Sequence, residues 1–396
     1  MKKLLWYSDF LVPTGFGNVA EELIDRLLAT GEYEIDVVAI NYNGDPIKLD
    51  GPYAKYIDKV HVYPAASYGD ADIWNMGKVL GLLATGYYDL FFTLQDTFNI
   101  ARMAPQMKEI CDTAKTKTVM YFPVDAYLKK EWVTDCLAHF DRIVAYNEYG
   151  KNAVLEHEYL HVDVIHHGAN KKFTPAKTDA QRNKFRKMIG LDEDAILITN
   201  VNRNQPRKDL LTTVMAFDMA ANERDDIHLY LHCDPYSRHG IDFSEVMKFV
   251  KNKERILFAN PEKDYSTEDM VDIYRASDLV FSTTLGEGAG LSFFEGIACE
   301  VPVAAPHDTS VPELQEDLIG GIHTVDPMDY VSLQNDNGLI RKRMSLSSAY
   351  LLLGSALGSL KDLKSGASVA RKHLMKKYNW DDSAEAFHNI FNELTK

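Results

Sequence analysis

The feature that most constrains the fold is a repeated alternation of short, apolar, β-rich runs with segments of helical spacing. Within residues 18–28, for example, Val19, Leu23 and Leu27 recur at the spacing of one helix face. The apolar runs are nearly continuous, as expected for parallel strands that helices cover on both faces. In the first half, the predicted strands are 4–8, 35–40, 60–63, 90–94, 119–124, 143–146 and 162–165. This pattern predicts a doubly wound α/β domain.

A break in this alternation falls at residues 168–179, where Gly168, Asn170 and Pro175 stand among polar residues. Such a segment is typical of an interdomain linker. After it the alternation resumes, with predicted strands at 196–201, 227–231, 256–258, 279–282 and 302–305. We therefore expect two Rossmann-like domains that face each other across a cleft. Ligands of such sheets bind beyond the carboxyl ends of the strands, so the loops after strands are the places to search.

Composition restricts the partners and the compartment. The chain of 396 residues has a formal net charge of −15, which argues against non-specific adhesion to nucleic acid or to an anionic membrane. Its longest apolar stretch, 349–360, is interrupted by glycines and serines and is too short to span a bilayer. We therefore expect no transmembrane segment. The four cysteines are scattered, so we also expect a cytoplasmic protein without structural zinc. They are Cys111, Cys136, Cys233 and Cys299.

The sharpest motif is the glycine-rich segment 283–295, which follows a predicted strand and begins a predicted helix. Gly288 and Gly290 allow backbone amides to approach an anion at the helix N-terminus, where the helix dipole also favours negative charge. Glu287 and Glu295 flank this position and could accept hydrogen bonds from hydroxyl groups. The arrangement suits a sugar nucleotide. The alternative for such a segment alone is a glycine-rich turn with two solvated acids.

A second motif, 202–209, follows another predicted strand and contains three cations within six residues. The fork of Arg203 and the point charge of Lys208 suit a diphosphate at the same sheet edge. On its own, the segment could equally be a solvated turn.

Together these motifs resemble the retaining glycosyltransferases of family 4 (glycosyl transferases group 1), which have the GT-B fold. Glu287 and Glu295 match the E-x7-E motif of that family, and Arg203 and Lys208 match its Arg-x4-Lys pair. The remaining similar segments are 164–170 (the interdomain V-I-P-H-G-V-D), 275–278, 299–303, 308–313, 325–327 and 378–381. The resemblance is dense from about residue 142 to residue 330.

The resemblance implies roles by position. Glu295 would bind the ribose hydroxyls of the donor and Glu287 the hydroxyls of its sugar. Arg203 and Lys208 would stabilise the leaving diphosphate, without a divalent metal or other cofactor. The residues implied to bind the donor through their backbone are Gly288, Gly290 and Leu291.

In the N-terminal half the resemblance is looser. Gly15 and Gly17 lie in the loop where relatives carry a glycine-rich G-G-x-G, although Thr14 replaces the first glycine. Asp125 follows a central strand, near which many relatives place a histidine close to the sugar. A helix cap at the strand end is the alternative for Asp125.

The resemblance implies four parts: an acceptor-side domain (1–170), a linker (171–179), a nucleotide-sugar-binding domain (180–377) and a helix that packs on the first domain (378–396). The implied function is retaining transfer of a sugar from a UDP- or GDP-sugar to an acceptor. Residues 1–170 hold 15 basic against 24 acidic residues, which favours a neutral acceptor over a polyanion. The open alternatives are transfer to a modified nucleic-acid base, a nucleotide-sugar epimerase or phosphorylase, and a non-catalytic nucleotide-sugar-binding scaffold.

Three further patterns have plainer explanations. Asp70 and Asp72 form a D-x-D, but they precede a helical stretch, so helix capping is favoured over metal binding. The histidines of 161–167 are too far apart on an extended strand to chelate one metal. We expect the basic clusters 341–343 and 371–377 to be solvated and outside the site.

Overall fold

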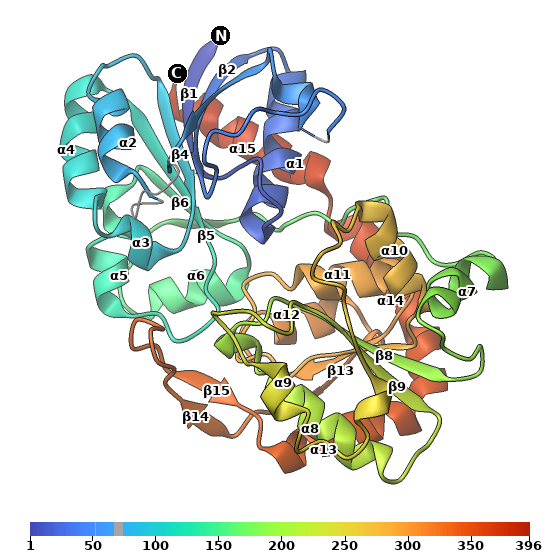
Figure 1. Cartoon of the computed structure of the whole chain (residues 1–396). Helices are drawn as coiled ribbons and strands as arrows, with labels where there is room; N and C mark the ends of the chain where they lie inside the picture. Colours follow the sequence, from blue (N-terminus) through green and yellow to red (C-terminus); the bar gives the residue numbers. More distant parts are fainter. Residues whose placement is uncertain (52, 67–73) are drawn as a thin grey trace. The chain divides into compact units, whose positions relative to one another are not determined.

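The computed structural model describes residues 1–51, 53–66 and 74–396. Its contacts divide the chain into two compact units, each built around a parallel sheet (Figure 1). Unit 1 comprises Met1–Val124, Leu128–Gly168 and Asn379–Lys396, and unit 2 comprises Asp125–Tyr127 and Ala169–Tyr378. The segment Asp125–Tyr127 therefore belongs to unit 2, although the chain on both sides of it belongs to unit 1.

Unit 1 contains a seven-stranded parallel sheet in the order β3-β2-β1-β4-β5-β6-β7. Its strands are β1 (Lys2–Asp9), β2 (Tyr33–Ile40), β3 (Val60–Pro64), β4 (Leu90–Leu94), β5 (Lys117–Phe122), β6 (Arg142–Ala145) and β7 (Val162–Val164). Its helices are α1 (Gly15–Ala29), α2 (Met76–Leu83), α3 (Thr97–Ile100), α4 (Ala104–Ala114), α5 (Lys130–Thr134), α6 (Glu148–Leu155) and α15 (Trp380–Leu394). All seven predicted strands are confirmed, and the strand order reverses between β1 and β4.

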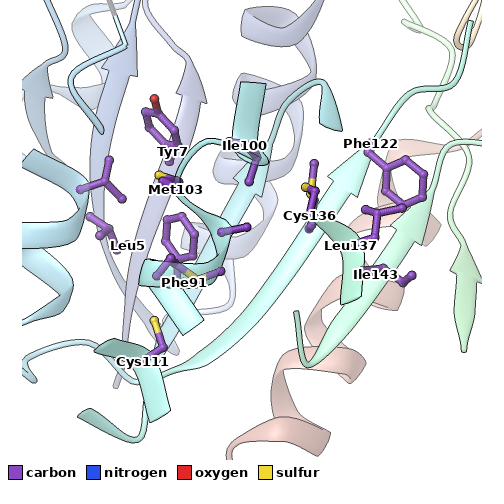
Figure 2. Packing of buried hydrophobic residues seen from close by; sticks show 14 of the residues in the cluster. Leu5, Tyr7, Phe91, Ile100, Met103, Cys111, Phe122, Cys136, Leu137 and Ile143 are labelled. Carbon is purple, nitrogen blue, oxygen red and sulfur yellow. The ribbon is translucent and has the colours of Figure 1, made fainter. Parts of the chain in front are cut away.

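The continuous apolar runs become strands that are buried on both faces. On one face, Leu5 and Tyr7 of β1 pack with Phe91 of β4 in a core that also contains the free cysteines Cys111 and Cys136 (Figure 2). On the other face, the rings of Trp6 and Phe92 lie 4.1 Å apart. This second apolar layer needs a cover, because water would otherwise contact it.

Helix α15 provides that cover from the C-terminal end of the chain. Its Phe387 and Phe391 contact the ring of Phe92 at centroid distances of 5.2 and 5.8 Å. At its start, Asp381 pairs with Arg26 of α1 at 2.7 Å. The helix thus completes the core of unit 1 (Figure 1).

Unit 2 contains a six-stranded parallel sheet in the order β10-β9-β8-β11-β12-β13 and a two-stranded antiparallel hairpin, β14–β15. Its strands are β8 (Ile196–Val201), β9 (Ile227–His232), β10 (Ile256–Phe258), β11 (Leu279–Phe281), β12 (Val303–Pro306), β13 (Ile322–Val325), β14 (Asp329–Val331) and β15 (Arg341–Arg343). Its helices are α7 (Asp179–Met188), the 3₁₀ helix η3 (Pro206–Lys208), α8 (Leu210–Ala221), α9 (Phe243–Val246), α10 (Thr267–Ala276), α11 (Leu291–Ala298), α12 (Val311–Asp317), α13 (Leu346–Gly358) and α14 (Leu360–Lys377). The five predicted strands are confirmed, whereas β13 and the hairpin are additional.

A buried ion cluster anchors two helices of unit 2 to its sheet. The carboxylate of Asp278, just before β11, accepts hydrogen bonds from Arg186 of α7 at 2.5 Å and from Lys364 of α14 at 2.6 Å. Arg186 is fully buried. Burial alone would raise the pKa of Asp278, but these cations and the amide of Leu197 outweigh it and hold that pKa below its usual value. The cluster is structural, because it lies at the amino end of β11.

Candidate functional site

The two motifs lie at the point where the sheet of unit 2 reverses its strand order. Strands β8 and β11 are neighbours, and the connections leave them toward opposite sides of the sheet. The first motif, 202–209, follows β8, and the second, 283–295, follows β11. In open α/β sheets, ligands bind beyond the carboxyl ends of the strands at such a switch point. The topology of unit 2 therefore brings both motifs to its expected ligand position.

Hydrogen bonds hold the two motif loops against each other. The amide of Leu285 donates to the carbonyl of Arg207 at 2.8 Å, and the hydroxyl of Thr283 donates to the carbonyl of Asp209 at 2.8 Å. The Arg207 guanidinium also donates to the carbonyl of Gly286 at 3.4 Å. The two loops thus form one rigid edge.

Within this edge, Lys208 and Glu287 form a buried ion pair. The Lys208 ammonium lies 2.5 Å from Oε1 of Glu287, and the two residues are 7% and 6% exposed. Thr309, in the loop after β12, supports Glu287: its hydroxyl accepts a hydrogen bond from the backbone amide of Glu287 at 3.0 Å. Burial lowers the pKa of Lys208 to about 8, although Glu287 opposes the shift. The pair offers one cation and one carboxylate to a ligand that enters the edge.

Two glycines shape the loop that carries Glu287 and leads into α11. Gly286 has φ +143°, and a Cβ there would lie 1.9 Å from the carbonyl oxygen of Asp125. Gly290 is the N-cap of α11 with φ +76°, a conformation that glycine adopts without steric cost. Helix α11 therefore begins at Leu291 directly after a sharp turn that includes Gly288. Its N-terminal amides and dipole favour an anion.

Glu295 lies farther along α11 and is partly buried. Its Oε2 accepts a hydrogen bond from the hydroxyl of Tyr274 in α10 at 2.8 Å. Burial raises the pKa of Glu295 to about 7, although the hydrogen bond from Tyr274 opposes the shift. Glu295 thus changes charge near neutral pH, in contrast to an ordinary glutamate.

Asp125 belongs to unit 2 and lies among cations. Its carboxylate is 3.3 Å from Arg207 and 3.2 Å from Arg341 of β15, and its backbone carbonyl accepts from Arg341 at 2.6 Å. Burial alone would raise the pKa of Asp125, but Arg207, Arg341 and Lys208 outweigh it and lower that pKa. The next helix, α5, has Lys129 as its N-cap, so Asp125 does not cap it.

The expectation that cluster 341–343 lies outside the site is wrong. Arg341 contacts Asp125, Lys342 pairs with Asp308 at 3.1 Å, and Arg343 contacts Asp209 at 3.0 Å. These acids lie in the loops that follow β5, β12 and η3. The hairpin therefore reaches the same edge as the two motifs.

The structure adds a second arginine, Arg207, to the predicted Arg203. Arg203 is exposed in the loop after β8, whereas Arg207, counted only as a third cation, is the arginine that faces Asp125 and Gly286. Sequence spacing could not distinguish the two, because the 3₁₀ turn of η3 sets which side chain points along the edge. Tyr274 and Thr309 were also missed: Tyr274 precedes the similar segment 275–278, and Thr309 lies in the similar segment 308–313 without having been given a role.

The remaining predicted residues, Gly15 and Gly17, lie in unit 1. Thr14 is the N-cap of α1: its hydroxyl accepts from the Gly17 amide at 2.9 Å and donates to Asp9 at 2.6 Å. A Cβ at Gly17 would lie 2.3 Å from the carbonyl of Val12, whereas one at Gly15 would meet nothing within 4 Å. Gly17 is therefore required by packing, and Gly15 is not.

The rival metal motifs have separate outcomes. The D-x-D at 70–72 lies outside the described residues. His161 pairs with Asp163 at 3.1 Å, while His167 is buried against Tyr146 and Trp380. Within residues 1–51, 53–66 and 74–396, no group of three histidine, cysteine or acidic side chains is arranged to hold a metal ion. No helix in the described part of the chain has the length and hydropathy needed to cross a membrane.

Comparison with known proteins relates part of the sequence to glycosyltransferases. No protein-family model matches the chain. A D-inositol 3-phosphate glycosyltransferase of Mycolicibacterium gilvum is 27% identical over 199 residues, which are 47% of this chain and 42% of that protein. Its counterpart in Mycolicibacterium smegmatis is 30% identical over 167 residues, which are 40% and 35% of the two chains. The matched segments thus span less than half of these curated relatives.

Solved structures match over nearly the whole chain at low identity. Anabaena Alr3699/HepE in complex with UDP-glucose has a TM-score of 0.72 at 14% identity and covers 99% of this chain and 100% of its own. Sucrose-phosphate synthase from Thermosynechococcus elongatus has a TM-score of 0.73 at 14% identity, and the match covers 100% of this chain and 99% of that protein. WaaG, a glycosyltransferase of lipopolysaccharide biosynthesis, has a TM-score of 0.69 at 13% identity, covering 98% and 99%. The chain therefore has the two-domain α/β fold of the GT-B glycosyltransferases.

Proposed function

We propose that this protein transfers a sugar from a nucleoside diphosphate sugar to a hydroxyl group of an acceptor, with retention of the anomeric configuration. The observation that carries the proposal is the buried pair of Lys208 and Glu287 beside the N-terminus of α11, at the switch point of unit 2. This arrangement provides what a sugar diphosphate requires: a cation and helix amides for the phosphates, and a carboxylate for the sugar hydroxyls. The glycosyltransferases among its relatives and structural neighbours support the proposal.

In the proposed reaction, the bond between the anomeric carbon and the diphosphate oxygen breaks as the acceptor oxygen bonds to the same face of that carbon. The acceptor proton passes to the leaving diphosphate. Negative charge grows on the diphosphate in the transition state, so fixed cations there lower the barrier. We assign this role to Lys208, with Arg203 and Arg207 on the same loop, and we propose that no divalent metal is needed.

The carboxylates would hold the donor by its hydroxyl groups. We assign the sugar hydroxyls to Glu287 and the ribose hydroxyls to Glu295, with the backbone of Gly288, Gly290 and Leu291 at the phosphates. Asp125 would bind a further substrate hydroxyl. For unit 1, we propose that the loop with Gly15 and Gly17 serves the same donor.

A uridine or guanosine diphosphate donor is proposed, and one structural neighbour, Anabaena Alr3699/HepE in its complexes with UDP-glucose and with UDP, supports uridine. For the acceptor, the excess of acidic residues in 1–170 favours a neutral hydroxyl compound over a polyanion.

The test is binding and turnover with a panel of UDP-, GDP-, ADP- and TDP-glucose in the presence of EDTA. One donor is expected to raise the thermal midpoint. At a hundred times its Kd, a bound donor stabilises the folded protein by about 2.7 kcal/mol. The same donor is expected to be slowly hydrolysed to the nucleoside diphosphate and glucose, because water can replace the acceptor. Lys208→Met should abolish hydrolysis, while Lys253→Met, on the opposite edge of the sheet of unit 2, should not.

Each alternative gives a different result in this assay. An epimerase would release an altered sugar, and a phosphorylase would need inorganic phosphate. A scaffold would bind a nucleotide sugar without consuming it. If none of the four donors binds at millimolar concentration, a glucose donor is refuted, and if UDP- and GDP-sugars other than glucose also fail to bind, the proposed function is refuted.

A further inference from the structure

Hairpin β14–β15 brings one arginine onto Asp125 from 216 positions along the chain. The Arg341 guanidinium donates from the same nitrogen to the backbone carbonyl of Asp125, at 2.6 Å, and to its carboxylate, at 3.2 Å. Arg341 therefore fixes both the main chain and the side chain of this residue. The amide of Tyr127, two residues farther, donates to the carbonyl of Ile340 at 3.5 Å. The segment 125–127 is thus attached to the hairpin at two points.

Arg341 is itself held in place. Asp336, in the turn of the hairpin, accepts from two nitrogens of Arg341, at 2.6 Å from Nε and at 3.2 Å from Nη2. Arg341 is 3% exposed. A two-pronged, planar contact of this kind specifies orientation as well as charge, and lysine cannot reproduce it. The guanidinium is therefore a fixed support for Asp125.

The carbonyl that Arg341 holds is also the one that contacts the donor loop. It approaches Gly286 so closely that a Cβ there would lie 1.9 Å away. Gly286 precedes Glu287, which pairs with Lys208. A shift of Asp125 would consequently be transmitted to the Lys208–Glu287 pair through a contact that has no free space.

We infer that Arg341 is a positioning residue: it holds Asp125 against the donor loop so that the Asp125 carboxylate meets a substrate hydroxyl in a fixed geometry. This inference rests on the proposed function. It adds a requirement that neither motif contains, because the hairpin lies outside the segments of family resemblance. In such sites, a displacement of about 1 Å can cost roughly a hundredfold in rate.

The charges around Asp125 give the inference a readout besides activity. The cations that face its carboxylate are Arg207 of η3, Arg341 of β15 and Lys208. Loss of Arg341 removes one of the three cations that lower the pKa of Asp125, so that pKa should rise. Because the carboxylate is 26% exposed, the remaining cations and solvent should keep it within a range that NMR can titrate.

The experiment compares Arg341→Met and Arg341→Lys with wild type in the hydrolysis of UDP-glucose. Arg341→Met is expected to lower kcat by about tenfold to a hundredfold, with KM for UDP-glucose changed less than about threefold. Arg341→Lys should recover part of the loss, since it restores charge without the fork. The control is Arg224→Met, which breaks an arginine–aspartate pair with Asp226 outside the site and should leave both constants unchanged.

A double variant separates positioning of Asp125 from a general loss of structure. If Arg341 acts by positioning the Asp125 carboxylate, adding Arg341→Met to Asp125→Asn should lower kcat by a smaller factor than Arg341→Met does in wild type, because that carboxylate is already absent. Full additivity of the two losses would overturn the inference. Equal kcat for Arg341→Met and wild type would also overturn it.

Carboxyl ¹³C NMR gives an independent answer. The pKa of Asp125 should be higher in Arg341→Met than in wild type, and unchanged in Arg224→Met. If wild type neither binds nor hydrolyses any nucleotide sugar, the proposed function is the statement that fails. In that case an identical Asp125 pKa in wild type and Arg341→Met would overturn the support by Arg341 as well.

Discussion

Replacing Glu295 with glutamine should make the protein more stable at pH 8, although Glu295 is a proposed ligand of the donor. Burial raises the pKa of this carboxyl to about 7, so at pH 8 the folded protein holds a carboxylate where burial disfavours charge. Glutamine has nearly the same shape and keeps an oxygen that can accept the hydrogen bond from Tyr274. It therefore removes the cost of the charge without removing the contact.

The size of the effect follows from the two ends of the titration. The folded pKa of about 7 lies above the ordinary value of 4.5. The folded protein therefore binds more protons than the unfolded chain between these pH values. The contribution of Glu295 to stability is fully present below about pH 4.5 and is lost as the pH rises through 7. At about 1.4 kcal/mol per pH unit, the loss is about 3 kcal/mol by pH 8. For a unit of this size, that corresponds to about 6 to 12 °C in Tm.

The measurement is the difference in thermal midpoint between Glu295→Gln and wild type from pH 5 to pH 8.5. The difference should be small at pH 5, grow up to about pH 7 and then level off. Glu262→Gln, an exposed glutamate of unit 2, is the matched control and should show no such curve. A flat difference between Glu295→Gln and wild type across this range would refute the argument that burial controls the charge of Glu295.

Three further changes test the ion pair, the buried cluster and the glycine loop. Lys208→Met should lower the thermal midpoint and abolish donor hydrolysis, since it leaves the buried Glu287 without its cation. Adding Glu287→Gln should recover stability but not hydrolysis. If stability is not recovered, the buried pair does not carry the desolvation cost assumed here. Asp278→Asn should cost about 3–5 kcal/mol in urea unfolding by leaving a buried arginine unpaired, with donor affinity unchanged in the folded protein. Gly17→Ala should lower the midpoint while Gly15→Ala should not, because a Cβ added at Gly17 would lie 2.3 Å from the carbonyl oxygen of Val12 and one at Gly15 would meet nothing within 4 Å.

The fold could be predicted from the sequence because burial dominates the strand pattern. Twelve near-continuous apolar runs became strands of two parallel sheets, since each is covered on both faces. The hairpin β14–β15 escaped prediction for the opposite reason. Its second strand, Arg341–Arg343, has no apolar residue, and all three side chains pair with acids outside the hairpin. A strand held by distant charges has no local signal.

The site was predictable where it depends on the strand pattern, and not where it depends on distant charges. Lys208 and Glu287 came together because each lies in the connection that follows a strand, and neighbouring parallel strands end at one edge. The choice of arginine was not predictable, because the turn at η3 directs Arg207 rather than Arg203 toward Asp125. The support by Arg341 depends on a contact across 216 positions, which spacing cannot reveal.

Asp125 and Glu295 show how one edge can hold two acids in different states. Burial favours the neutral form of both, yet the pKa of Asp125 is lowered and that of Glu295 is raised to about 7. The difference lies in their neighbours: three cations face Asp125, whereas a neutral tyrosine hydroxyl contacts Glu295. At neutral pH, Asp125 is therefore ionised while Glu295 is about half protonated. Donor affinity should therefore fall between pH 8 and pH 6, by about tenfold if only the carboxylate of Glu295 binds, while Lys208, with a pKa of about 8, gains charge over the same range and opposes this fall. Arg341→Met should leave that step in place and change only the titration of Asp125, at lower pH.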